Sequence, residues 1–177
     1  MAILPILEAP HPVLSQKARP VTSDEFGPAL SERLSDMAET MYAAPGVGLA
    51  APQVGDGRRM LVANLAGDED AESRDRLIMM VNPVIEEHSK ETITWDESCL
   101  SVPEYELDVV RFERVRVSWQ SMDGAQHEEW FEAFPAVVLQ HEIDHLEGVT
   151  LLDRSSRLKR KRYVSRQKKR RLTASQP

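Results

Sequence analysis

The segment from Phe134 to Gly148 constrains the fold more than any other part of this 177-residue chain. Apolar residues lie on most sides of a helix drawn through it, and such a helix is buried in a protein core. Pro135 suits the first helical turn, where a missing N–H costs nothing, and Gly148 suits the position just past the last turn. The sequence therefore predicts a short central helix around which the rest of the chain packs.

The same segment contains an HExxH arrangement, formed by His141, Glu142 and His145. Residues four apart lie on one helical face, one turn above the other, so both histidines can bind a single divalent metal. Glu142 can then act as general base toward a water molecule on that metal. The alternative is a pair of hydrogen-bonded core histidines. The glutamate between them and the apolar surroundings favour a metal site.

A catalytic site of this kind needs a third protein ligand and leaves one position open. In one metalloprotease pattern that ligand is a histidine, but the corresponding residue here is Leu151. A second class uses a downstream glutamate, yet no Asp or Glu follows Asp153. The remaining candidate is the single cysteine, Cys99, whose thiolate suits zinc or iron.

Cys99 has two competing interpretations. It can be an inert buried residue, or a nucleophile paired with a histidine. A nucleophile would leave Glu142 and the spacing of His141 and His145 unexplained. The pattern therefore favours a metal ligand.

A second distinctive stretch, Gly46–Gln53, reads Gly-Val-Gly-Leu-Ala-Ala-Pro-Gln. It partly matches a dinucleotide-binding fingerprint, but that fingerprint follows a strand and opens a helix. Here the stretch follows a helical pattern and runs into Pro52, so no nucleotide cofactor is expected. Its small residues predict a loop that a peptide backbone can approach closely, with the Gln53 amide able to donate to a developing oxyanion. The alternative is an ordinary turn.

The remaining segments show helical and strand patterns that are segregated along the chain, which favours an α+β fold. An acidic loop is expected over 67–75 and an amphipathic helix over 28–43. The predicted strands cover 59–65, 77–86 (broken at Pro83), 91–95, 107–119 and 126–132.

Charge divides the chain into two parts. Half of its 22 Lys and Arg residues lie from Arg154 onward, where there is no acidic residue, although the net charge is −7. We expect one domain over 1–153 and a basic, helical tail over 154–177. A polyanion such as RNA is favoured as the partner of the tail over a merely solvated helix.

The sequence also limits where the protein works. A lone cysteine excludes an internal disulfide and is typical of a reducing compartment. The N-terminus is a poor signal peptide, and no apolar run is long enough to span a membrane. We therefore expect a cytoplasmic protein that does not bind membranes.

Taken in order, Gly46–Gln53, Glu97–Ser101 and Gln140–Leu146 resemble the motifs of the peptide deformylase family, and Ile6–Leu14 resembles its opening segment. The resemblance covers nearly the whole chain. It implies mixed and antiparallel sheets around a central HExxH helix, with a basic C-terminal helix in the bacterial type. It also implies removal of the N-formyl group from the formyl-methionine of nascent polypeptides.

By position, the resemblance assigns the metal to Cys99, His141 and His145. Metal-bound hydroxide would attack the formyl carbon with Glu142 as general base, while Gln53 and the Leu100 backbone N–H stabilise the oxyanion. The implied ion is Fe²⁺ in the cell, with Zn²⁺, Ni²⁺ or Co²⁺ also acceptable, and the implied partner of tail residues 154–171 is ribosomal RNA. The implied substrate-binding residues are Val47, Gly48, Leu49, Trp95, Phe134, Val137 and Val138.

Two positions depart from the family pattern. Ser98 replaces the usual glycine before the cysteine, and Glu106 stands where some members carry arginine, although the arginine further on is present as Arg111. Neither departure removes a catalytic group, so they bear on rate and substrate range. Two rival functions remain: a cysteine hydrolase using Cys99 and a histidine, and a non-catalytic ribosome-associated module with a structural metal.

Overall fold

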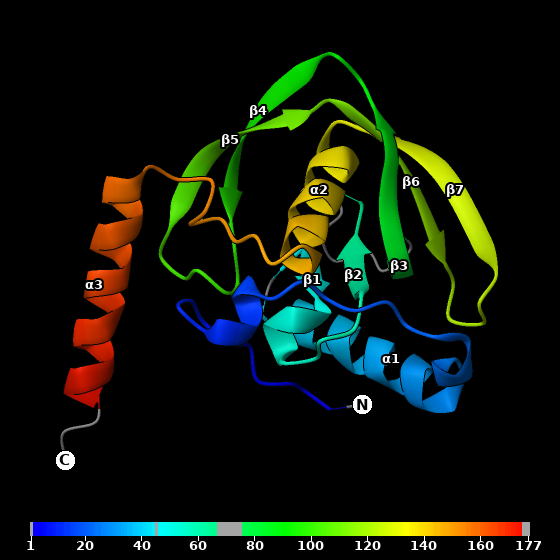
Figure 1. The fold of residues 1–177 in the computed structure, drawn as a ribbon, viewed down its shortest axis with the longest axis horizontal. Helices are drawn as coiled ribbons and strands as arrows, with labels where there is room; N and C mark the ends of the chain where they lie inside the picture. The colour runs from blue at the N-terminus through cyan, green and yellow to red at the C-terminus, as the bar shows by residue number, and fades with distance from the viewer. Residues whose placement is uncertain (1, 45, 67–75, 175–177) are drawn as a thin grey trace.

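The computed structural model describes residues 2–44, 46–66 and 76–174, with side chains up to Arg170. The predicted α+β fold is confirmed, and Figure 1 shows the central helix α2 with strands around it. The helices are α1 (Pro28–Ala43), α2 (Phe134–Leu146) and α3 (Arg157–Ala174). The strands are β1 (Gly48–Ala50), β2 (Met60–Asn64), β3 (Leu77–His88), β4 (Thr92–Ser98), β5 (Glu106–Phe112), β6 (Arg114–Gln120) and β7 (Gln126–Glu132).

The strands form two antiparallel sheets. One has five strands in the order β1-β2-β3-β6-β7, and the other is a two-stranded ribbon of β4 and β5. Helix α2 contacts β1, β2 and β7 of the first sheet and β5 of the second. It therefore lies where both sheets can present side chains to it (Figure 1).

The position of α2 follows from its sequence. Leu139 and Leu146 are fully buried against β2, β3 and β6, as expected of a helix that is apolar on most sides. Gly148, just past the helix, has a φ of +75°, and a Cβ there would lie 2.9 Å from the carbonyl of Ser15. Only glycine fits both conditions, which fixes where α2 ends and how the chain leaves it.

The prediction of a single strand over 107–119 is wrong. The chain changes sheet at Glu113, so that β5 pairs with β4 while β6 pairs with β3. Buried and exposed residues alternate in β5 and again in β6, so the hydropathy pattern does not mark the change of partner.

The predicted break at Pro83 is also wrong, because β3 runs through it. The pairing with β6 shifts register between Val81 and Val84, and Asn82 adopts a φ of 53° there. A bulge of this kind accommodates a proline that cannot donate a hydrogen bond. The acidic loop expected over 67–75 lies outside the described residues.

The expectation of a loop over Gly46–Gln53 needs correction too. Gly48–Ala50 forms β1, which pairs with β2, and Ala51–Val54 forms a 3-10 turn. β1 is the edge strand of the five-stranded sheet. β1 has only three residues, all small or apolar, and a segment this short gives no recognisable strand pattern in the sequence.

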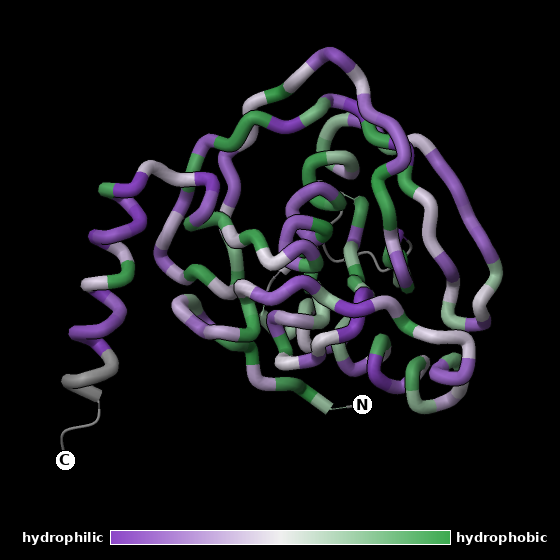
Figure 2. Tube along the Cα trace, viewed as in Figure 1, coloured by the Kyte–Doolittle hydropathy of each residue, from purple (hydrophilic) through white to green (hydrophobic). Residues whose placement is uncertain are grey.

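The basic C-terminal segment is helical as predicted, and it stands at the side of the body in Figure 1. Figure 2 shows that it is mostly hydrophilic. Tyr163, however, is only 3% exposed, and its hydroxyl donates to the Pro103 carbonyl at 3.3 Å. One face of α3 is therefore packed on the body. None of the described helices is both long and apolar enough to cross a membrane.

Candidate active site

Cys99, His141 and His145 come together at the centre of the molecule. α2 carries both histidines, and Cys99 directly follows β4. Their ligand atoms all lie within 4.8 Å of one another, and Sγ of Cys99 is 3.2 Å from Nε2 of His145. Ligands bound at about 2.0–2.3 Å from one zinc-type ion are separated by comparable distances. One sulfur and two imidazole nitrogens also suit such an ion chemically.

The state of Cys99 supports this fit. Burial opposes ionisation of its thiol, but the neighbouring His145 and His141 outweigh that effect and lower its pKa to about 5. The thiolate is the form that binds metals, so the side chain is ready for coordination at neutral pH.

A buried acidic residue lies behind one of the histidines. Oε2 of Glu97 is 2.7 Å from Nδ1 of His141, and Arg111 donates to both carboxylate oxygens at 2.6 and 2.9 Å. Burial raises the pKa of Glu97, but the hydrogen bonds from Arg111 and His141 outweigh it and lower the pKa to about 2. An ionised carboxylate that accepts from Nδ1 leaves Nε2 of the imidazole free for a metal.

The network extends beyond Glu97. Arg111 also donates to Asp144 at 2.6 Å, and Arg154 donates to both oxygens of Asp144 at 2.9 and 2.6 Å. Sequence reasoning gave Glu97, Asp144 and Arg154 no role at the site. One signal could have identified Glu97: it stands two residues before Cys99 in the cysteine motif. An acidic residue buried at such a position is rarely without a cationic partner, so a partner such as Arg111 could have been expected.

Glu142 is the second buried acid of the site. It is 4% exposed, burial raises its pKa to about 7, and its Oε2 has no hydrogen-bond partner. A Cβ on Gly48 would lie 2.3 Å from Oε1 of Glu142, so the carboxylate packs directly on the backbone of β1. A buried carboxylate oxygen without a partner, beside three ligand atoms, fits a site that accepts a metal, water and substrate.

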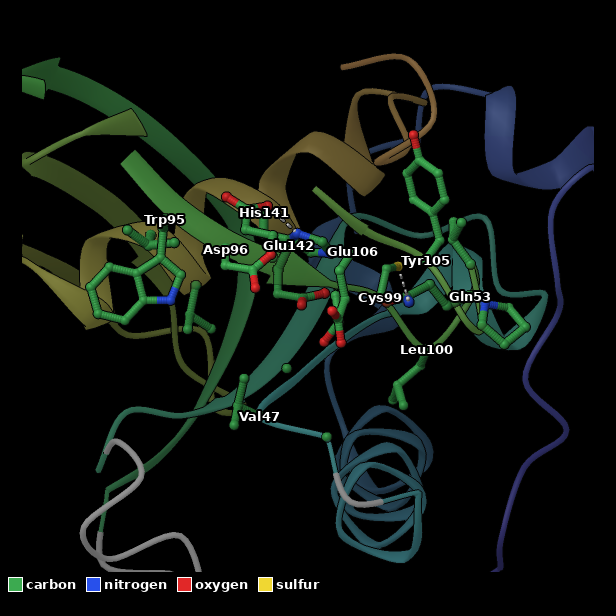
Figure 3. A pocket seen from close by; sticks show the side chains of 18 of the residues that line it. Val47, Gln53, Trp95, Asp96, Cys99, Leu100, Tyr105, Glu106, His141 and Glu142 are labelled. Atoms are coloured by element: carbon green, nitrogen blue, oxygen red, sulfur yellow. Dashed lines mark hydrogen bonds and ion pairs between the residues drawn. The ribbon is translucent and has the colours of Figure 1, made fainter. Parts of the chain in front are cut away.

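A cavity of about 470 Å³ opens over this cluster (Figure 3). Its wall includes Glu106, one of the two positions expected to affect substrate range, and the loop Val102–Tyr105, which the sequence did not predict as part of the site. Most of the predicted site residues line it: Val47, Gly48, Gln53, Trp95, Cys99, Leu100, Phe134, Val137, Val138, His141 and Glu142.

Two predicted site residues do not line the cavity. The side chain of His145 is 1% exposed and lies behind Cys99. Leu49 is fully buried in the core between α1 and the sheet, and it is not among the residues that line the cavity.

The amide of Gln53 is held in one orientation. Its Oε1 accepts from the backbone N–H of Ala50 at 2.8 Å, which turns Nε2 toward Oγ of Ser101 at 3.2 Å and Sγ of Cys99 at 3.8 Å. The donor atom therefore faces the metal-capable cluster, as its predicted role requires.

Comparison with known proteins agrees with these observations. The model of the family described as polypeptide deformylase matches residues 3–161. The chain belongs to the peptide deformylase family. Members of this family are metal-dependent hydrolases that remove the N-formyl group from nascent peptides, and this is the activity of the chain.

Individual deformylases match along nearly the full length. The peptide deformylase of Wolinella succinogenes is 46% identical over 169 residues, covering 95% of this chain and 97% of the relative. The structure of the Legionella pneumophila enzyme has a TM-score of 0.86 at 39% identity and covers 99% and 100% of the two chains. A Met-Ala-Ser-bound structure of the Acinetobacter baumannii enzyme has a TM-score of 0.81 at 34% identity and covers 87% and 99%.

Proposed function

We propose that Cys99, His141 and His145 hold one divalent ion and that Glu142 is the general base of deformylation. The observation that carries this assignment is the Oε2 atom of Glu142, which is buried without a partner beside the three ligand atoms. When bound, the ion supplies a Lewis acid for the formyl carbonyl and acidifies a water molecule. The protein then has to position the groups and move one proton.

Glu142 has the properties that the proton transfer requires. Burial raises its pKa to about 7, so at neutral pH it can both take a proton and return it. It accepts the proton from water as the formyl carbon is attacked, and it passes that proton to the leaving amine nitrogen. The products are formate and a free N-terminus.

The developing oxyanion needs fixed donors. We assign them to Nε2 of Gln53, whose orientation is set by the backbone of Ala50, and to the backbone N–H of Leu100. Losing one such donor typically lowers the rate about 100-fold or more.

The apolar end of the cavity suits the methionine side chain. Trp95 and Phe134 have their ring centroids 5.9 Å apart, and Val137 and Val138 continue this wall along α2. Val47, Gly48 and Leu49 lie at the edge strand β1, where an extended peptide backbone can add by main-chain hydrogen bonds. The Acinetobacter relative has a structure with Met-Ala-Ser bound, which supports a short methionyl peptide as a ligand of this family.

The metal itself is assigned by resemblance. We propose Fe²⁺ in the cell, since a Cys/His/His set accepts Fe²⁺, Zn²⁺, Ni²⁺ and Co²⁺ alike. Anaerobic purification followed by metal analysis and a formyl-Met-Ala-Ser assay tests both the ion and the reaction. A cysteine hydrolase would keep its turnover after chelation, and a non-catalytic module would show none with the metal present.

We also propose that residues 1–153 are the catalytic domain and that the tail over 154–177 docks on ribosomal RNA in the cytoplasm. The support is the concentration of Lys and Arg on α3 and a reaction that acts on nascent chains. A chain ending at Ser156 should bind ribosomes more weakly and with a shallower dependence on salt. Unchanged ribosome affinity would contradict the proposal.

A further inference from the structure

Acidic side chains dominate the charge of the cavity lining. Five of the residues that line the cavity are acidic and none is Lys or Arg. Glu97 is neutralised by Arg111, and Glu142 is the proposed base. The other three, Asp96, Glu104 and Glu106, are exposed and lie at the mouth of the cavity.

The three exposed carboxylates differ in their partners. Glu104 is paired with Arg170 of α3, with 2.9 Å between Oε1 and Nη1. Within the described part of the chain, no ion pair reaches Asp96 or Glu106. These two side chains therefore present uncompensated negative charge to whatever occupies the cavity mouth.

Asp96 and Glu106 belong to a site that other observations establish as a binding site. Glu142, nine-tenths buried and with an unpartnered Oε2, also lines this cavity. Asp96 stands on β4 next to Trp95, and Glu106 starts β5, paired in register with Ser98. Both residues line the cavity, and Figure 3 labels their side chains among those drawn around it.

The course of the substrate follows from these positions. With methionine between Trp95 and Phe134 and the formyl group at Glu142, the next residues of the peptide have to leave through the mouth. Their side chains then pass Asp96 and Glu106. A cation there gains an exposed ion pair, whereas an acidic side chain is repelled.

We infer that Asp96 and Glu106 make this enzyme select formyl-methionyl chains with Lys or Arg in the first positions after methionine and discriminate against Asp or Glu there. The inference rests on the proposed function of the cavity. Exposed pairs of this kind correspond to a preference of about two- to fivefold in kcat/KM for each position at low salt. The preference shrinks as salt screens the charges.

The test compares short peptides on the metal-loaded full chain. Formyl-Met-Lys-Ser, formyl-Met-Ala-Ser and formyl-Met-Glu-Ser vary the second residue, and formyl-Met-Ala-Lys and formyl-Met-Ala-Glu vary the third. At low salt we expect kcat/KM to fall in the order Lys, Ala, Glu in at least one series. The order should flatten at high salt.

Two variants locate the cause. The double variant D96N/E106Q should bring the Lys-to-Glu ratio close to one, and E106R should invert or abolish it. The matched control E91Q/E113Q removes two exposed charges at the opposite end of the same ribbon, away from the cavity, and should keep the wild-type ratio.

Equal rates for the Lys and Glu peptides at low salt would overturn the inference while leaving deformylation intact. The same would follow from an unchanged preference in D96N/E106Q, or from its loss in E91Q/E113Q. Absence of any turnover of formyl-Met-Ala-Ser would overturn the proposed function and this inference together.

Discussion

Nδ1 of His141 lies 2.7 Å from Oε2 of Glu97, so an ionised carboxylate stands directly behind one of the proposed metal ligands. This contact fixes the ring and its tautomer, because an ionised carboxylate can only accept a hydrogen bond, so Nδ1 has to carry the hydrogen. Replacing Glu97 with alanine should lower the affinity for the metal by about 10- to 100-fold. Competition against a chelator of known affinity measures the change.

A control for Glu97→Ala is Glu129→Ala, which removes an exposed acid of β7. It should leave the metal affinity within the error of the wild type. Equal metal affinities for the Glu97 variant and the wild type would show that the carboxylate does not support the ligand.

The contact between Arg154 and Asp144 predicts a difference between two truncated chains. A chain ending at Ser156 keeps Arg154, whereas one ending at Asp153 loses it and leaves Asp144 with Arg111 alone. Both lose α3 and Tyr163, so the two chains differ only in Arg154, Ser155 and Ser156, and of these only Arg154 contacts Asp144. The shorter chain should bind the metal about two- to fivefold more weakly, as expected for the loss of a partly exposed ion pair at the edge of the network. Equal metal affinities of the two truncated chains would show that Arg154 does not support the metal site.

The sequence was sufficient to predict that Cys99, His141 and His145 come together, because i, i+4 spacing on a helix is a local property and Cys99 was the remaining candidate for a third ligand. The contact of Glu97 with His141 was not predictable in the same way. Glu97 meets Arg111 only because β4 and β5 pair across a turn, and both reach α2 only because the ribbon folds over it. Such contacts depend on tertiary placement.

The same limit explains the errors in the fold. α1, α2 and β7 were predicted with nearly correct bounds because their period or their turn residues lie within the segment. The change of sheet at Glu113 was missed because alternation is identical on both sides of it. The packing of Tyr163 on Pro103 was missed because a single aromatic residue among cations gives no periodic signal.

Gly48 should tolerate no side chain. The Cβ of Gly48→Ala would lie 2.3 Å from Oε1 and 2.7 Å from Cδ of Glu142, so the carboxylate has to move. Turnover should fall by about 100-fold, as for a misplaced catalytic group, while metal content is retained. The matched control is Gly57→Ala, where a Cβ meets nothing within 4 Å. Near-normal turnover in Gly48→Ala would contradict the assignment of Glu142.

The stability of the metal-free protein should depend on Glu97 in acid. The pKa of Glu97 falls from its ordinary 4.5 to about 2 in the folded state, so the ionised carboxylate stabilises the fold above pH 4.5. This contribution, of the order of 3 kcal/mol, is lost as the pH falls from about 4.5 to about 2. In urea titrations, the free energy of unfolding of Glu97→Gln should decrease less than that of the wild type over this pH range. If the free energies of unfolding of the variant and the wild type changed in parallel with pH, the ionised form of Glu97 would not stabilise the fold.

The central claim is that Glu142 moves the proton while Cys99, His141 and His145 hold the metal. The most direct measurement is the metal content of Glu142→Gln, purified anaerobically, together with its turnover of formyl-Met-Ala-Ser. We expect one divalent ion per chain, as in the wild type, and a rate reduced by about 100-fold or more. A rate close to that of the wild type, with the ion in place, would contradict the claim.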